Sequence, residues 1–351
     1  MALGGELIIR QFFNPIDHLL AELQKDNILG HIISPSTTGH DSWGFRNKSV
    51  PENVDIVMIG DSQTYGTAST QKMSYPSQVE ALSGLTTYNL ALGGYGPAHY
   101  YILAKKSEKL SPKAMTIGLY FGNDLMDVFN YVYDPSFELF KHLRLDTFSG
   151  SDTFKPVVFT KKKFAVIRDF LAHHSVIYRL ITQNELFDNF RANENKRKGS
   201  ERIIIRNDRE EIIAILNSDA RHKSMDVSNP RIQEGIRLTH ILVKQIKLFC
   251  DASNIKLTII LIPTKISVYE DQVLGSNEER LKLTLENEHK LFEEFADRFD
   301  ESGIHFINAL IPLQEASQNR LNIYPITDGH LNNLGNTVLS KYVVKKLLDR
   351  K

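Results

Sequence analysis

Short apolar runs alternate with longer amphipathic segments over most of this 351-residue chain. The first run, residues 54–59, is rich in β-branched side chains and stops at Gly60, a pattern typical of a buried parallel strand that ends at a turn. Four similar runs cover residues 86–92, 114–121, 256–262 and 304–310. Helical spacing of apolar residues predicts helices over residues 73–83, 98–110, 238–249, 278–301 and 333–349.

This alternation predicts an α/β fold, because successive parallel strands need a helix to connect them. We expect a doubly wound parallel sheet of about five strands, formed by residues 54–127 and 231–351. We expect residues 1–53 to form an N-terminal arm that packs on this core. The arm should contain a helix within residues 6–29 and an irregular loop over residues 31–53.

Residues 128–230 interrupt the alternation and predict an insertion or cap that covers or flanks the crevice at the sheet's edge. The insertion reads as mainly helical: helices are expected over residues 161–190 and 210–216, with one short strand at residues 203–205.

Composition and charge narrow the range of partners. The chain has 42 lysine and arginine residues and 42 aspartate and glutamate residues, so its formal net charge is zero. No net positive charge attracts nucleic acid, and we expect no nucleic-acid partner. The single cysteine, Cys250, excludes an internal disulfide and is expected to be a buried thiol. No apolar stretch is long enough to span a bilayer, so we expect membrane association only through a segment absent from this chain.

The candidate chemistry lies where the first three predicted strands end. Ser62 follows the first strand, Gly94 lies in a glycine-rich turn after the second, and Asn123 follows the third. Because the carboxyl ends of parallel strands form one rim, and ligands of open α/β sheets bind there, we expect these residues to face one crevice.

These residue types suit acyl transfer. A serine hydroxyl needs a base to remove its proton, and the base needs an acid to orient it, so Ser62, His330 and Asp328 are the candidate catalytic residues. The Ser62 amide, the Gly94 amide and the Asn123 side chain are the candidate oxyanion hole. No motif for zinc or for a nucleotide phosphate is present, and we expect no metal site and no cofactor.

Four blocks of this sequence resemble those of the SGNH or GDSL-type esterases and lipases, in the family's order. They are Gly60-Asp61-Ser62, residues 89–94, Gly122-Asn123-Asp124 and Asp328-Gly329-His330. The resemblance implies a flavodoxin-like fold, a three-layer α/β/α sandwich around the central parallel sheet. It implies hydrolysis or transfer of acyl groups without a metal or organic cofactor. It also implies nucleophile, oxyanion-hole and acid–base roles for the residues named above.

The last block departs from the usual Asp-x-x-His, because one residue separates Asp328 from His330. Residues two apart do not share a helix face, so we expect a loop whose backbone freedom comes from Gly329. An Asp-x-His pattern and the segment 263–269 resemble larger bacterial members that acetylate or deacetylate cell-surface polysaccharides. This resemblance favours an extracytoplasmic setting, either periplasmic or membrane-anchored in a longer native form.

Three functions remain open from the sequence. The leading hypothesis is a serine esterase that acts on a small-molecule or carbohydrate acyl ester. The second is a polysaccharide O-acyltransferase in which a sugar hydroxyl replaces water in deacylation. The third is a non-catalytic carbohydrate-binding module that retains the fold.

Overall fold

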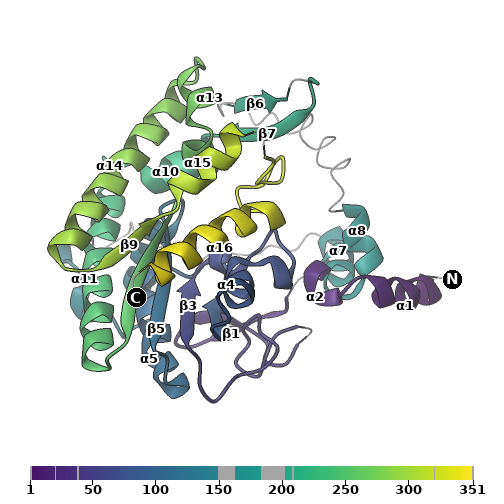
Figure 1. Ribbon diagram of the computed structural model, residues 1–351, viewed down its shortest axis with the longest axis horizontal. Coiled ribbons are helices and arrows are strands. Elements are labelled where there is room, and N and C mark those ends of the chain that lie inside the picture. The colour runs from purple at the N-terminus through teal and green to yellow at the C-terminus, as the bar shows by residue number, and fades with distance from the viewer. Residues whose placement is uncertain are drawn as a thin grey trace.

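The computed structural model describes residues 2–19, 21–37, 39–148, 163–182, 202–207, 209–319 and 321–349. Its centre is a parallel sheet with the strand order β4-β3-β5-β8-β9 (Figure 1). The five strands are β3 (Ile56–Gly60), β4 (Thr87–Ala91), β5 (Ala114–Tyr120), β8 (Lys256–Ile262) and β9 (His305–Asn308). In chain order this is 2-1-3-4-5, the flavodoxin-like arrangement, which confirms the predicted fold class.

Helices cover both faces of the sheet because alternate strand residues enter two separate apolar cores. Val57 and Ile59 lie in one core, against α5 (Pro97–Lys106) and α11 (Pro230–Ala252). Ile56 and Met58 lie in the other, against α4 (Tyr75–Ser83) and α16 (Asn333–Leu348). Burial on both faces explains why β3 reads as an unbroken apolar run rather than an alternating one.

The remaining core helices complete these layers. α6 (Asp124–Tyr133) packs against α5 and α11, and α15 (Leu310–Gln318) packs against α16. α14 (Glu279–Glu301) lies beside β9 and contributes to both apolar cores. Short elements fill the connections: α3 (Ser62–Tyr65), α12 (Lys265–Val268), α13 (Glu270–Leu274), and the 3-10 helices Gln71–Met73, Ser107–Leu110, Lys141–Leu143 and Asp146–Phe148.

The predicted elements of the core are present, with shifted ends. β8 has the bounds that the apolar run predicts, and α14 differs by a single residue. α11 begins eight positions before its predicted start, at Pro230, because proline suits the first helical position and Asn229 accepts a hydrogen bond from the Arg231 amide. Cys250 is buried in α11, as predicted.

The N-terminal arm differs from the prediction. It begins with α1 (Ala2–Phe12) and α2 (Pro15–His18), but the expected helical segment and loop also contain an antiparallel hairpin of β1 (Leu23–Asp26) and β2 (Gly30–Ile33). Asp26 makes this turn by accepting hydrogen bonds from the amides of Ile28 and Leu29, and Gly30 supplies a φ of 72°.

The insertion contains α7 (Lys163–His174), α8 (Val176–Thr182), β6 (Arg202–Arg206), β7 (Ile212–Asn217) and α10 (Asp219–Met225). The helix predicted over residues 210–216 is therefore wrong. Its β-branched residues instead pair with β6 as strand β7, because a partner strand is available. The parts of the prediction at residues 161–162 and 183–190 lie outside the described residues.

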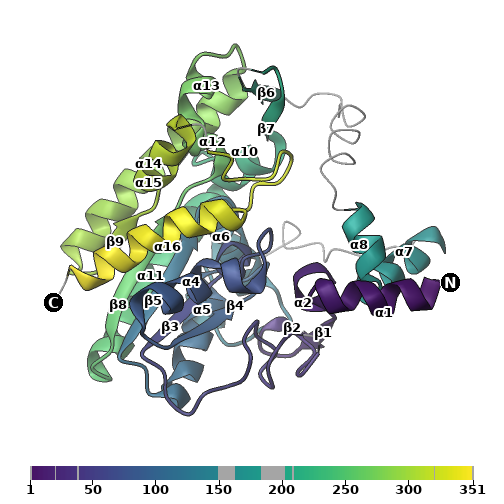
Figure 2. The same ribbon diagram turned by 45° about the vertical axis from the view of Figure 1, so that its right-hand side comes forward.

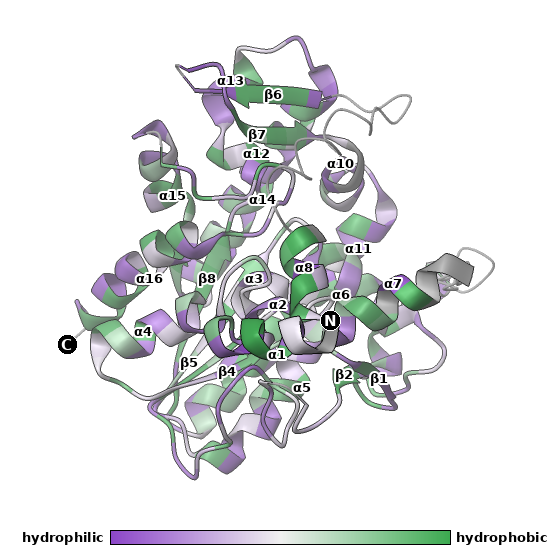
Figure 3. Ribbon diagram, turned by 90° about the vertical axis from the view of Figure 1, so that its right-hand side faces the viewer, coloured by the Kyte–Doolittle hydropathy of each residue, from purple (hydrophilic) through white to green (hydrophobic). Residues whose placement is uncertain are grey.

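The insertion touches the rest of the molecule at several places. α8 contacts α1 and α2, and the three helices form a group at one side of the sheet (Figure 2). β6 and β7, which carry many hydrophobic residues, lie at the top of Figure 3, and β6 contacts α13. No helix in the described part of the chain is long and apolar enough to cross a membrane.

Candidate active site

Ser62 begins α3 directly after β3, at the carboxyl edge of the sheet. Asp61 caps this helix by accepting a hydrogen bond from the Gln63 amide at 2.8 Å. Position 60 has no room for a side chain, because a Cβ there would lie 2.0 Å from the Thr64 hydroxyl oxygen. The strand order reverses between β3 and β5, so Ser62 lies at the switch point where this fold type forms its ligand crevice.

A continuous chain of hydrogen bonds joins the three candidate catalytic side chains. The Ser62 Oγ lies 2.8 Å from the Nε2 of His330, and the Nδ1 of His330 lies 2.6 Å from the Oδ1 of Asp328. With Nδ1 bound to a carboxylate, the proton of the neutral ring is held on Nδ1, and Nε2 is free to accept the serine proton.

Asp328 and His330 lie in a loop before α16, as the one-residue spacing predicts. The same Asp328 Oδ1 accepts hydrogen bonds from the backbone amide and from the ring of His330, which closes a compact turn. The φ of Gly329 is not positive. The prediction that this loop depends on the backbone freedom of Gly329 is therefore wrong. Burial raises the pKa of Asp328, but hydrogen bonds and charge from His330 outweigh it and hold that pKa below its ordinary value.

Among the described residues, the backbone N–H groups of Ser62 and Gly94 have no hydrogen-bond acceptor. Ser62 is the first residue of α3, where no acceptor exists within the helix. The Gly93 carbonyl accepts a hydrogen bond from His31 at 2.9 Å, so the N–H of the same trans peptide, that of Gly94, points away from His31. Gly94 has a φ of 81°, a backbone conformation in which a residue with a side chain would be strained.

Asn123 precedes α6 at the end of β5, and its side chain is already held. Its Nδ2 donates to the Oδ2 of Asp127 at 2.5 Å, which leaves the second N–H of the amide for another acceptor. Burial raises the pKa of Asp127 to about 7, although the Asn123 hydrogen bond lowers it in part. Asp127 thus fixes the direction of the Asn123 amide, a role that the sequence blocks did not indicate.

Ser62 has a second contact that competes with His330. Its Oγ lies 3.2 Å from the Oδ2 of Asp61, longer than its contact with the His330 ring. A hydroxyl has one proton and can serve only one acceptor at a time. Burial raises the pKa of Asp61, although hydrogen bonds and the charge of His330 lower it in part.

Two residues that the sequence analysis did not assign hold the loop of Asp328. Gln63 donates from Nε2 to the Gly329 carbonyl at 3.0 Å and accepts from the Leu331 amide at 3.3 Å. The buried Lys265 donates from Nζ to the carbonyls of Pro325, Ile326 and Asp328, at 2.8, 2.9 and 3.2 Å. The sequence does hold a signal for Lys265, because it is the one charged residue in the mainly apolar segment 257–268.

Arg221, from α10 of the insertion, is a further residue at this site that the sequence did not assign. Its Nη1 donates to the Gly122 carbonyl at 2.6 Å, and the hydroxyl of Ser224 donates to the same oxygen at 2.7 Å. The guanidinium carbon lies 5.1 Å from the centre of the Tyr120 ring. The insertion therefore supplies a cation next to the turn that carries Asn123.

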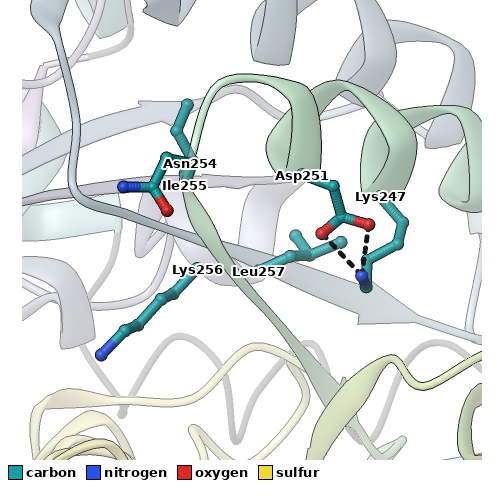
Figure 4. Close-up of a pocket in the computed structure, with 6 residues that line it drawn as sticks. All are labelled: Lys247, Asp251, Asn254, Ile255, Lys256 and Leu257. Atoms are coloured by element: carbon teal, nitrogen blue, oxygen red, sulfur yellow. Dashed lines mark hydrogen bonds and ion pairs between the residues drawn. The ribbon is translucent and has the colours of Figure 1, made fainter.

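The described residues hold no group of three histidine, cysteine, aspartate or glutamate side chains that could bind a metal ion. A pocket lined by Lys247, Asp251 and residues 254–257 lies at the start of β8, the end of that strand remote from the candidate active site (Figure 4). The Lys247–Asp251 ion pair occupies its wall.

Comparisons with known proteins give structural matches only. No protein-family model matches the chain, and no curated protein matches its sequence. An extracellular lipase from Streptomyces rimosus is similar, with 13% identity, a TM-score of 0.44 and coverage of 85% of this chain and 100% of that chain.

Two further matches have lower TM-scores. A GDSL-like lipase from Bacteroides thetaiotaomicron has 9% identity, a TM-score of 0.38 and coverage of 86% of this chain and 93% of its own. A family two carbohydrate esterase from Clostridium thermocellum, in complex with cellohexaose, has 11% identity, a TM-score of 0.37 and coverage of 86% and 65%.

Proposed function

We propose that this chain is an SGNH or GDSL-type serine hydrolase that cleaves O-acyl esters, with acetyl or another short acyl group, through an acyl-enzyme intermediate. The observation that carries the proposal is the hydrogen-bonded chain from Ser62 through His330 to Asp328 at the carboxyl edge of the sheet. Activating a hydroxyl in this way is the chemistry that acyl transfer needs.

In the proposed mechanism the Ser62 Oγ attacks the ester carbonyl while Nε2 of His330 accepts the hydroxyl proton. The Asp328 carboxylate orients the ring and stabilises the imidazolium that forms. The Ser62 and Gly94 amides and the Asn123 side chain stabilise the developing oxyanion. His330 then returns the proton to the leaving alcohol, and a water molecule activated by the same ring hydrolyses the acyl-serine.

The test is p-nitrophenol release from p-nitrophenyl acetate by the wild type and Ser62→Ala, with both the burst and the steady state followed. Steady turnover should fall at least ~10³-fold in Ser62→Ala, since a missing nucleophile disables the whole triad. The matched control is Ser253→Ala, an exposed serine at the end of α11, which should retain wild-type rates. Equal rates for the wild type and Ser62→Ala would refute the proposal.

The alcohol part of the natural ester is proposed to be carbohydrate, on the sequence resemblance to polysaccharide-modifying enzymes, which also supports an extracytoplasmic setting. The same assay separates hydrolysis from transfer. A hydrolase turns over steadily in water, whereas a transferase gives a burst that stalls until a sugar acceptor is added.

A further inference from the structure

Arg221 lies between two parts of the candidate active site. Its Nη1 binds the Gly122 carbonyl, immediately before Asn123. Its Nη2 lies 3.8 Å from the position that a Cβ on Gly329 would occupy, between Asp328 and His330. One guanidinium therefore reaches both the oxyanion turn and the acid–base turn.

The orientation of this guanidinium is fixed on one side only. The Nη1 contact with Gly122 and the Tyr120 ring at 5.1 Å hold the group. Among the described residues, no acceptor pairs with its Nε or Nη2, and neither atom is a buried, unpaired group. The half-buried side chain thus keeps donors that a ligand can reach.

The positive charge also lacks a direct counter-ion. No carboxylate in the described part of the chain lies within ion-pair distance of Arg221. Burial raises the pKa of Asp61 and of Asp127, and the charge of Arg221 lowers both in part. Each of these acids already accepts a hydrogen bond from another group, Gln63 for Asp61 and Asn123 for Asp127.

We propose that Arg221 determines substrate specificity by binding an anionic group, such as a carboxylate, on the acyl or alcohol part of the ester. The guanidinium fork matches the two oxygens of a carboxylate, and the low dielectric beside the triad strengthens the contact. This inference rests on the proposed esterase function and adds its substrate class: acyl esters that carry a negative charge close to the reacting carbonyl.

The test compares kcat/KM for neutral and anionic esters in the wild type, Arg221→Gln and Arg221→Lys. p-Nitrophenyl acetate is the neutral substrate, mono-p-nitrophenyl succinate carries the charge on the acyl part, and 4-carboxyphenyl acetate carries it on the alcohol part. Arg221→Gln should lower the rate on at least one anionic ester by about 10- to 100-fold more than on p-nitrophenyl acetate, the range for a charge-assisted hydrogen bond. Arg221→Lys should keep part of the preference, since it keeps the charge without the fork.

Arg209→Gln is the matched control, because Arg209 is exposed in the turn between β6 and β7. It should leave both the rates and the ratio unchanged. If Arg221→Gln lowers the rate on all three esters equally, the residue only balances Asp61 and Asp127, and the specificity role is refuted. A wild type inert on all esters, or matched by Ser62→Ala, would instead refute the hydrolase function on which the inference depends.

Discussion

At the scale of single residues, the buried cation Lys265 holds the loop of the candidate acid Asp328. Its ammonium has three donors, and each has one backbone carbonyl as acceptor, all within residues 325–328. Burial lowers the pKa of Lys265 to about 7, and the charge of Asp328 raises it in part. Removing the ammonium would take this donor from all three carbonyls, and among the described residues only that of Ile326 has a second donor, the Ile215 amide, so we expect the position of Asp328 to depend on Lys265.

Lys265→Met should lower kcat for p-nitrophenyl acetate at least ~10-fold with a smaller change in KM, because the loop that aligns Asp328 with His330 loses its anchor. The free energy of unfolding should fall by about 3 kcal/mol, as for breaking a buried charge-assisted network. The far-downfield proton resonance of the His330 Nδ1–H, measured by NMR, should broaden or vanish. These three measurements separate loss of alignment from general unfolding.

Two variants complete this experiment. Lys290→Met, an exposed lysine on α14, should match the wild type in all three readouts. Lys265→Arg keeps a cation and should recover part of the rate. A Lys265→Met enzyme with the wild-type rate and an intact downfield resonance would show that Lys265 does not position the triad.

The sequence could place Ser62, His330 and Asp328 in one site because each lies in a block with a recognisable local pattern. It could not assign Lys265 or Gln63, since their partners are backbone atoms that only the fold brings close. Asp127 was missed for another reason: its partner Asn123 is only four residues away, but no block marks the pair. It also misjudged Gly329, because a short turn closed by the Asp328 side chain needs no positive φ.

At the scale of elements, a close contact between the helices α6 and α11 depends on Gly235 of α11. A Cβ at this position would lie 2.0 Å from the carbonyl oxygen of Leu125 in α6. α6 begins at Asp124, next to Asn123, so a shift of α6 away from α11 would move one side of the candidate oxyanion hole. We therefore expect the packing of α11 to affect activity through this helix pair.

Gly235→Ala should therefore destabilise the protein by about 1–3 kcal/mol, the usual cost of forcing an extra group into a packed core, and should lower kcat. Thermal unfolding and ester hydrolysis check the two effects. Gly4→Ala in α1 is the matched control, since no atom lies within 4 Å of its added Cβ, and it should not destabilise the helix. A Gly235→Ala variant as stable as the wild type would contradict the close approach of α6 and α11.

The elements that the sequence predicted well are those with strong periodicity, such as β8 and α14. The elements it missed are short and depend on a partner. β7 reads equally as a short helix until β6 is placed beside it, and the β1–β2 hairpin depends on a turn closed by Asp26. Local pattern alone decides neither case.

At the scale of the whole molecule, the insertion is joined to the loop of the candidate acid and base. The Ile215 amide of β7 donates to the Ile326 carbonyl at 2.8 Å, and the same carbonyl accepts from Lys265. The two isoleucine side chains also form a small buried apolar cluster. Because α10 of the same insertion carries Arg221, one segment outside the sheet both supports the loop and supplies a cation to the site.

Ile215→Ala should loosen this junction. It removes buried methyl groups between β7 and the loop, so we expect a loss of about 2–4 kcal/mol in unfolding free energy and a several-fold lower kcat/KM for p-nitrophenyl acetate. Ile204, the residue paired with Ile215 on β6, is 42% exposed, so Ile204→Ala is the control and should change neither quantity. If both variants hydrolyse the ester at the wild-type rate while only Ile215→Ala is destabilised, the hairpin supports folding but not the alignment of Asp328. A rate loss confined to Ile215→Ala requires the insertion and the crevice to act as one unit.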